Sequence, residues 1–245
     1  MVVTQNVQNG DPAPGIIQMS GVYFAWPGER SFRISVESFA LEKGSRTLLL
    51  GPSGSGKSTL LSLLCGIAPP DRGSIRLLGT DITALSSAAR DRFRADHIGI
   101  IFQMFNLLPY GSAVDNVLLP LSFAKERRER VSAAGGQRQE AERLLCGLGI
   151  EGDLLTGSAS RLSVGQQQRV AAARALIGAP EIIIADEPTS ALDRGREDAF
   201  LKLLFEQVEA AASTLIMVSH DESLSPRFDQ VLQLADIVKR EETAA

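Results

Sequence analysis

The sequence predicts an α/β fold built around a parallel β-sheet, and three observations support it. Four short, continuous apolar runs, RTLLLG, HIGIIF, EIIIAD and TLIMVSH, are bounded by polar or turn residues and separated by helical stretches. Runs of this kind are typical of strands covered on both faces. The 245 residues, 44% of them hydrophobic, suffice for one large α/β domain or two modest ones. A glycine-rich loop between the first run and a helical segment fits the same architecture.

The remaining segments differ in character. Residues 1–15 are rich in Pro, Gly and Asn, and we expect them to be disordered. The runs IIQMSGVYFAW and SFRISVESF carry the alternation and residue types of β-strands, separated by a PGER turn. From about residue 104 to 178 the sequence indicates helices rich in Arg and Glu, inserted into a single domain of residues 16–240. The run KERRER there could suggest an anionic partner, but mixed charges at helical spacing favour a solvated helix face.

Composition excludes several classes of protein. The net charge of −4 argues against a general nucleic-acid-binding protein. No apolar run reaches the roughly 20 residues that a membrane-spanning helix needs, and the first fifteen residues lack the apolar block of a signal peptide. Cys65 and Cys146 show no metal-type spacing, and we expect both to be reduced thiols that fill the core. The chain is therefore expected to be soluble or peripheral to a membrane.

The segment GPSGSGKST predicts a phosphate-binding loop. It follows the apolar run RTLLL, precedes the helical LLSLLC and matches the pattern G-x-x-x-x-G-K-[ST]. Glycines allow backbone N–H groups to close on phosphate oxygens, and the helix N-terminus adds its positive end. We expect Lys57 to reach the β- and γ-phosphates of ATP and Ser58 to bind Mg²⁺. The residues predicted to bind ATP here are Gly51, Pro52, Ser53, Gly54, Ser55, Gly56, Lys57, Ser58 and Thr59.

A second apolar run ends in two carboxylates, in the segment IIIADEP. Charges at the end of a buried strand are costly unless they have a role. We expect Asp186 to hold Mg²⁺ and Glu187 to orient or deprotonate an attacking water. An Asp-Glu pair alone would be weak support, but the phosphate loop upstream makes the interpretation strong.

The segment RLSVGQQQRV begins another predicted helix. Ser163 is a good N-cap, and the helix N-terminus behind it presents free N–H groups. On its own, this segment would be interpreted as an ordinary capped helix.

Taken in order, the phosphate loop, LSVGQQQRV, IIIADEPTSALD and VSHD resemble the nucleotide-binding subunit of an ABC transporter, from about residue 16 to 238. The resemblance implies a P-loop NTPase with a RecA-like core, an antiparallel β subdomain and an inserted α-helical subdomain. It also implies an ATPase that works as a head-to-tail dimer of two copies, with two ATP molecules and Mg²⁺ held between them.

In this family the RLSVGQQQRV turn faces the γ-phosphate bound by the other protomer. The resemblance assigns that contact to Ser163, Gly165 and Gln166, and it places the other glutamines and Arg169 polar side outward near the partner. The family usually has Gly where this chain has Val164. We expect Val164 to be tolerated, because its N–H is retained and a position after a Ser cap is right-handed helical.

The resemblance also implies functional roles for four further residues. It implies that Gln103 senses Mg²⁺ and the attacking water, that His220 contacts the γ-phosphate, and that Asp193 crosses the dimer interface. It also implies that Trp26 stacks on adenine, with Tyr23 and Phe24 as nearby competitors. Without the resemblance, each would be interpreted as structural, as His97 is.

The segment FRADHIGIIFQMFNLLPYGSAVDNVLLPL resembles the bacterial ATPases of lipoprotein release and macrolide export. This implies an inner-membrane permease as partner, a peripheral position on the cytoplasmic side of that membrane, and no direct contact with the cargo. We expect the docking surface between Leu107 and Val131. Ser45 departs from the Glu that the family mostly has. An importer subunit and a soluble ABC ATPase are the alternatives, and the intact catalytic residues disfavour an inactive scaffold.

Overall fold

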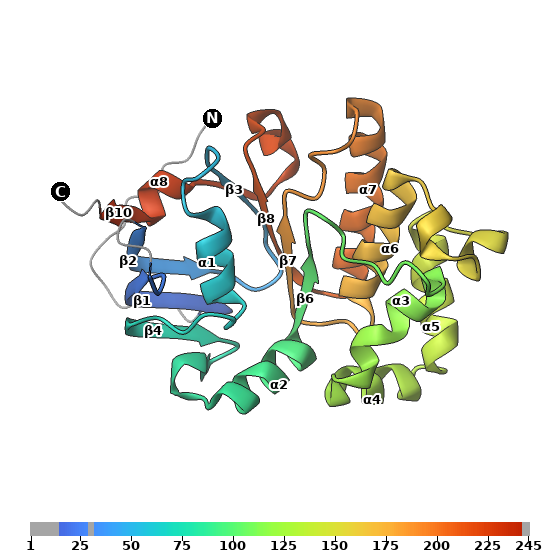
Figure 1. The fold of residues 1–245 in the computed structure, drawn as a ribbon, viewed down its shortest axis with the longest axis horizontal. Helices are drawn as coiled ribbons and strands as arrows, with labels where there is room; N and C mark the ends of the chain where they lie inside the picture. The colour runs from blue at the N-terminus through green and yellow to red at the C-terminus, as the bar shows by residue number, and fades with distance from the viewer. Residues whose placement is uncertain (1–14, 29–31, 242–245) are drawn as a thin grey trace.

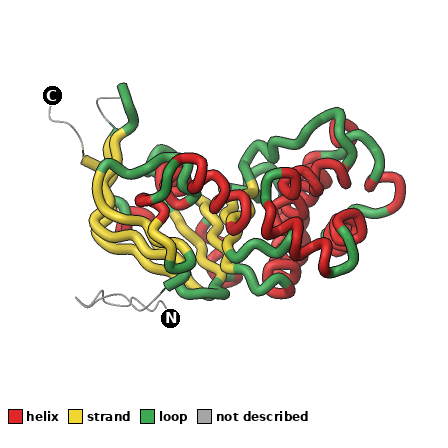
Figure 2. The backbone as a smooth tube through the Cα atoms, turned by 90° about the horizontal axis from the view of Figure 1, so that it is seen from below, coloured by secondary structure: helices red, strands yellow, loops and turns green. Residues whose placement is uncertain are grey.

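The computed structural model describes residues 15–28 and 32–241 and contains two five-stranded sheets (Figure 1). The strand orders are β10-β2-β1-β4-β5 and β6-β7-β8-β3-β9. Nearly all of the tail predicted to be disordered, residues 1–14, lies outside the described residues. Figure 2 shows the strands gathered in one half of the molecule and most helices in the other.

The first sheet is antiparallel and comes mostly from the N-terminal third of the chain. Its strands are β1 (Ile17–Ala25), β2 (Arg33–Leu41), β4 (Arg72–Leu77), β5 (Thr80–Asp81) and β10 (Lys239–Glu241). The pairing of β1 with β4 shifts between Ser20 and Tyr23. Gly73 occupies this irregularity at φ 85°, and a Cβ there would lie 2.4 Å from the carbonyl oxygen of Gly21. Only glycine therefore permits the close approach of the two strands.

The second sheet is parallel in every pairing. Its strands are β3 (Arg46–Leu50), β6 (Ile98–Ile101), β7 (Ile182–Asp186), β8 (Thr214–Ser219) and β9 (Gln230–Gln233). Four of them are the apolar runs of the sequence, which confirms the α/β prediction. Since parallel strands end at a common edge, the segments after β3, β7 and β8 are brought together there.

Two hydrophobic cores cover the two faces of this parallel sheet. Leu48 and Leu50 of β3 and Ile183 of β7 face one core, which contains residues of α3, α5, α6 and α7. Leu49 and Ile184 face the other core, with α1 and the antiparallel sheet. Both faces of the strands are thus buried, which explains the continuous apolar runs.

The helices fall into those near the sheets and those of a separate helical part, and α7 packs in the same core as α3, α5 and α6. Those near the sheets are α1 (Lys57–Leu64), α2 (Ser87–His97), α7 (Arg194–Ala210) and α8 (Leu234–Ile237). A helical part lies beyond β6 in Figure 1 and contains α3 (Ala113–Leu118), α4 (Lys125–Ala133), α5 (Gln137–Gly147) and α6 (Val164–Leu176). Short 3₁₀ turns are η1 (Ile82–Ala84), η2 (Leu119–Ser122), η3 (Gly152–Leu155), η4 (Ala159–Arg161) and η5 (Glu222–Arg227). Within the described residues, no helix combines the length and the apolarity needed to cross a membrane.

The prediction that KERRER forms a solvated face is wrong for Arg127. This side chain of α4 is 2% exposed and donates hydrogen bonds to the carbonyl oxygens of Ile177 at 2.7 Å and Ala175 at 2.9 Å. Burial, aided by the charge of Arg130, lowers the pKa of the Arg127 guanidinium to about 10. The carbonyls in the last turn of a helix have no partner within the helix, and Arg127 supplies one for α6.

The prediction for the cysteines is half correct. Cys65 is buried, and burial raises the pKa of its thiol to about 12. Cys146 is exposed at the end of α5 and fills no core.

Candidate active site

The predicted phosphate loop joins the end of β3 to the start of α1. Gly54 and Gly56 adopt left-handed φ values of 74° and 105°, which favour glycine. Gly56 is the N-cap of α1, and among the described residues no side chain caps this helix with a hydrogen bond. An uncapped helix start behind a glycine loop fits a phosphate group, because both the free N–H groups and the helix dipole favour an anion.

Lys57 connects this loop to the neighbouring strand. Its ammonium lies 2.8 Å from Oε1 of Glu187 and donates to the carbonyl oxygens of Gly51 at 2.8 Å and Pro52 at 3.3 Å. The residue is 7% exposed, so the charge depends on these contacts for its solvation. A buried cation at the mouth of a glycine loop is the group expected to meet phosphate oxygens.

Glu187 stands between two basic groups. Its Oε1 contacts Lys57, and its Oε2 lies 3.2 Å from Nδ1 of His220, which follows β8. Burial raises the pKa of the Glu187 carboxyl, but Lys57 and His220 outweigh it, and the pKa lies below its usual value. Glu187 is therefore ionised at neutral pH, as a group that orients or deprotonates water must be.

The pKa of Asp186 is shifted in the opposite direction to that of Glu187. Burial and the charge of Glu187 raise the pKa of the Asp186 carboxyl, and Lys57 opposes this only in part. Two adjacent carboxylates repel each other, and a divalent cation is the partner that would relieve this. The described residues contain no group of three or more His, Cys, Asp or Glu side chains arranged to hold a metal. Mg²⁺ fits nonetheless, because it is commonly held by one or two carboxylates together with phosphate oxygens and water.

Trp26 lies beside the end of the phosphate loop. Its Nε1 donates to Oγ1 of Thr59 at 3.0 Å, and its ring meets Phe24 edge-on with centroids 5.0 Å apart. Phe24 is buried, and Tyr23 packs under Arg72 instead. Among the three aromatics considered, Trp26 is the one that touches the phosphate loop, although stacking on adenine stays a prediction.

The start of α6 follows the predicted capping pattern. Oγ of Ser163 accepts from the N–H of Gln166 at 3.4 Å, and Oε1 of Gln166 accepts from the N–H of Ser163 at 2.8 Å, which forms a capping box. The helix begins at Val164, which is 51% exposed. A Cβ at Gly165 would meet only Cδ2 of Leu192, at 3.9 Å, so the face around Gly165 is open.

The prediction that the following glutamines point outward is wrong for Gln168. This residue is fully buried, and its Nε2 donates to the carbonyl oxygen of Pro188. Gln167 is half-buried, and its Nε2 donates to the carbonyl oxygen of Leu162 at 2.9 Å. Nothing in the local pattern distinguishes one glutamine of the triplet from the next.

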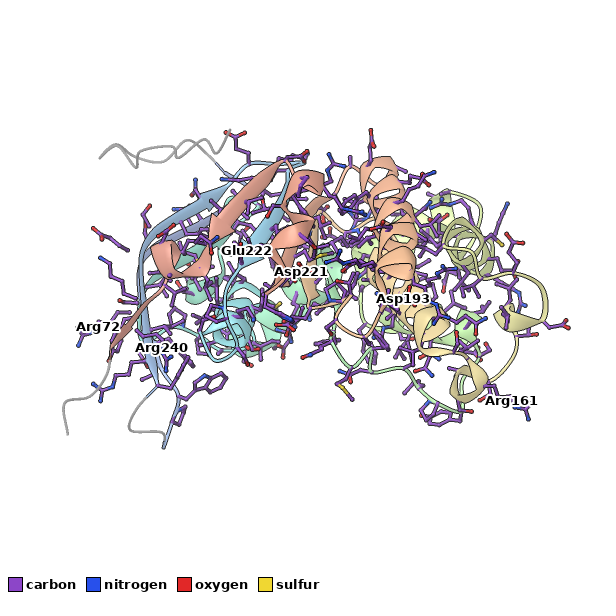
Figure 3. All side chains as sticks on the ribbon, turned by 90° about the horizontal axis from the view of Figure 1, so that it is seen from above. Arg72, Arg161, Asp193, Asp221, Glu222 and Arg240 are labelled. Atoms are coloured by element: carbon purple, nitrogen blue, oxygen red, sulfur yellow. The ribbon has the colours of Figure 1, made fainter. Side chains whose placement is uncertain are left out.

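The remaining predicted residues lie outside the cluster of Lys57, Glu187 and His220. Asp193 is the exposed N-cap of α7, where its Oδ1 accepts from the N–H of Arg196 at 3.0 Å. Gln103 is exposed in the turn after β6. Figure 3 shows Asp193 near the middle of the molecule and Arg161, just before Ser163, at the far end of the helical part.

Arg174 is a further buried residue that was not predicted from the sequence. Its guanidinium donates to the carbonyl oxygens of Phe105 and, at 2.6 Å, Asn106, which both adopt left-handed φ values. It thereby fixes the loop after Gln103 against α6. Burial lowers the pKa of the Arg174 guanidinium. An Arg in an Ala-rich helix carries no signal of burial, because its partners are carbonyls remote in sequence.

The loop around Lys57 and the carboxylates at the tip of β7 define the class of the protein, a P-loop nucleoside triphosphatase. The family model for the ABC transporter matches residues 35–190, and the chain belongs to this family. It is an ATPase that uses ATP and Mg²⁺.

Individual relatives agree with this assignment. The chain is 40% identical over 223 residues to the lipoprotein-releasing system ATP-binding protein LolD of Anaeromyxobacter dehalogenans, and 90% of each chain is covered. It is 38% identical over 196 residues to the macrolide export ATP-binding/permease protein MacB of Rhodopirellula baltica, covering 80% of this chain and 28% of that one. A dimeric, post-hydrolysis structure of the ATP-binding cassette MJ0796 with ADP and Pi has a TM-score of 0.77 and 30% identity, over 94% of this chain and 99% of that one.

Proposed function

We propose that the chain is the ATP-hydrolysing subunit of a bacterial inner-membrane transporter or mechanotransmitter of the lipoprotein-release and macrolide-export type. It binds a permease at the cytoplasmic face of the membrane and does not contact the cargo. The similarity to LolD over 90% of both chains supports the subfamily, and the similarity to MacB fits a partner that is a permease.

The observation that carries this proposal is the separation of the two halves of the site. Lys57 and Glu187 form one cluster at the edge of the parallel sheet. Ser163 is bonded to Gln166 of its own helix, and α6 packs in the core on the opposite face of the sheet from α1. We infer that a nucleotide at Lys57 meets Ser163 and Gly165 of a second copy, arranged head to tail. Asp193, exposed at the start of α7, is available to cross that interface.

The chain's own residues divide the chemistry among them. Lys57, with the free N–H groups of α1, holds the phosphates, and phosphate binding competes with the Lys57–Glu187 contact of 2.8 Å. Glu187, once released from Lys57, orients the attacking water, and His220 stays beside its other oxygen. Asp186, Ser58 and Gln103 are the proposed Mg²⁺ side chains.

Mg²⁺ supplies positive charge that stabilises the negative charge developing on the phosphoryl oxygens. Catalysis in such a site is mostly positioning and charge stabilisation, to which Lys57 and Glu187 contribute.

The proposed docking surface lies in the segment 107–131. Its side chains Tyr110 and Phe123 are 81% and 73% exposed, and Met104 just before the segment is 80% exposed. Exposed large apolar side chains of this kind mark a contact surface. Elsewhere, Ile67 is 54% exposed in the turn after α1, on the other side of the sheet, and serves as a matched control.

Co-purification from membranes tests the partner. Tyr110→Glu and Phe123→Glu should retain the ATPase activity of the isolated protein and lose co-purification with the permease, while Ile67→Glu should keep both. Wild-type co-purification of both variants would place the docking surface elsewhere. Recovery of the native protein entirely in the soluble fraction would favour a soluble ABC ATPase, and co-purification with a substrate-binding-protein system would favour an importer.

A further inference from the structure

Gln168 is a buried amide whose bonding is only half satisfied. It lies within α6 and is 0% exposed, and its Nε2 donates to the carbonyl oxygen of Pro188 in the loop after β7. In the part of the chain that the structure describes, its Oε1 is buried without a hydrogen-bond partner. A buried polar atom without a partner is costly, and a methionine would fill the same volume without that cost. What glutamine supplies here is the bond to Pro188.

The bond reaches the residue directly after Glu187. Glu187 has a left-handed φ of 43°, a conformation that a non-glycine residue keeps only when its surroundings hold it. Its own N–H donates to the carbonyl oxygen of Val218 on β8 at 3.0 Å. Proline has no N–H, so the carbonyl is the only backbone group of Pro188 that can be held by a hydrogen bond. Gln168 and β8 thus hold the backbone of this turn from two sides.

We propose that Gln168 is a positioning residue for Glu187. By tying α6 to the loop after β7, it sets the backbone from which the Glu187 carboxylate extends beside His220. The inference rests on the proposed function, in which Glu187 orients the attacking water. It also links two sites, because Ser163, which is proposed to meet the nucleotide of the other protomer, is the N-cap of the same helix.

Steady-state ATPase kinetics of Gln168→Met test this role. Methionine keeps the length and lacks the donor. We expect an unchanged fold, a KM for Mg-ATP within about two-fold of the wild type, and a kcat lower by about ten-fold, since small misplacements of a catalytic group cost up to about 10²-fold. Gln207→Met is the control, because Gln207 lies on α7 outside the proposed site and its Oε1 accepts, among the described residues, a hydrogen bond only from the side chain of Arg143, at 3.3 Å. Its kcat should stay at the wild-type value.

A double-mutant cycle with Glu187→Gln separates positioning from a general structural effect. If Gln168 acts through Glu187, adding Gln168→Met to Glu187→Gln should lower the residual rate no further. Wild-type kcat in Gln168→Met, or a ten-fold fall that persists in the Glu187→Gln background, would overturn the inference.

Two further outcomes are distinguishable. Should Gln168→Met not fold, Gln168→Leu, which also lacks the donor, carries the same test; if neither folds, Gln168 acts in folding and the inference is overturned. A wild-type activity insensitive to Glu187→Gln would contradict the proposed function itself. An activity that depends on Glu187 but not on Gln168 would contradict only this inference.

Discussion

Replacing Arg127 by methionine should destabilise the protein, and by more than replacing the exposed Lys125 of the same helix. The substitution leaves the carbonyl oxygens of Ile177 and Ala175 buried without their donor, at contacts now 2.7 and 2.9 Å long. Each unsatisfied buried acceptor costs about 1–3 kcal/mol. Removing the guanidinium also removes its own desolvation cost, which offsets part of the loss. We therefore expect a net loss of about 2–4 kcal/mol in the free energy of unfolding.

Thermal and urea denaturation measure this loss. For a chain of this size, each kcal/mol shifts Tm by about 2–4 °C, so Arg127→Met should melt roughly 5–15 °C below the wild type. Lys125→Met is the matched control on the same helix. The Lys125 side chain is 71% exposed, and its ion pair, with Nζ 3.8 Å from Oε1 of Glu129, is long and exposed to solvent. The free energy of unfolding of this control should lie within about 0.5 kcal/mol of the wild-type value. An Arg127→Met variant as stable as this control would refute the reasoning that Arg127 anchors the end of α6.

Three further predictions concern the turn, the pH dependence and the nucleotide. Val164→Gly should change the ATPase rate of the reconstituted complex by only a few-fold, since Val164 is exposed at the first helical position. Gly165→Asp should nearly abolish that rate, because it places a carboxylate at the proposed phosphate contact. An inactive Val164→Gly or an active Gly165→Asp would contradict this. The hydrogen bond to Glu181, at 3.0 Å, raises the pKa of His97 above 6.5, and the bonds from His97 and Arg130 outweigh burial and lower the pKa of Glu181 from 4.5 to about 2. The stabilisation from His97 is therefore complete below pH 6.5 and is lost as the pH rises through its raised pKa, whereas that from Glu181 is complete above pH 4.5 and is lost as the pH falls towards 2. Urea denaturation at a series of pH values should show that the His97–Glu181 pair stabilises the fold most between pH 4.5 and 6.5. This stabilisation should be absent in His97→Gln, and an unchanged pH profile of stability in that variant would contradict the prediction. Trp26→Ala should raise the KM for ATP by about ten-fold and Trp26→Phe by much less, as expected for a stacking contact worth about 1–3 kcal/mol; equal effects would favour another aromatic.

The sequence pattern predicted those parts of the fold that local chemistry determines. The strands β3, β6, β7 and β8 are buried on both faces and could be recognised from their apolar runs alone. The capping box of Ser163 and Gln166 also depends on neighbours three residues apart. By contrast, β9 is largely exposed and lacks an apolar run, so no periodic signal identifies it.

The candidate site was predictable in its residue types but not in its contacts. The common edge of the parallel strands explains why Lys57, Glu187 and His220 meet. The burial of Arg127 and Gln168 was not predictable, because each side chain bonds to a carbonyl on a distant element, 50 and 20 residues away in sequence. Periodicity cannot show which polar side chain of a helix will face an unsatisfied carbonyl.

The central claim, that ATP is hydrolysed between two copies of this chain, is tested most directly by the molar mass of Glu187→Gln with and without Mg-ATP. Light scattering coupled to size exclusion should give a monomer without nucleotide and a dimer with Mg-ATP, with hydrolysis at least about 10²-fold slower than in the wild type. Lys57→Ala should stay monomeric under both conditions, because Lys57 is the buried cation of the phosphate loop. A Glu187→Gln protein that stays monomeric with Mg-ATP, or that hydrolyses ATP at the wild-type rate, would contradict the account.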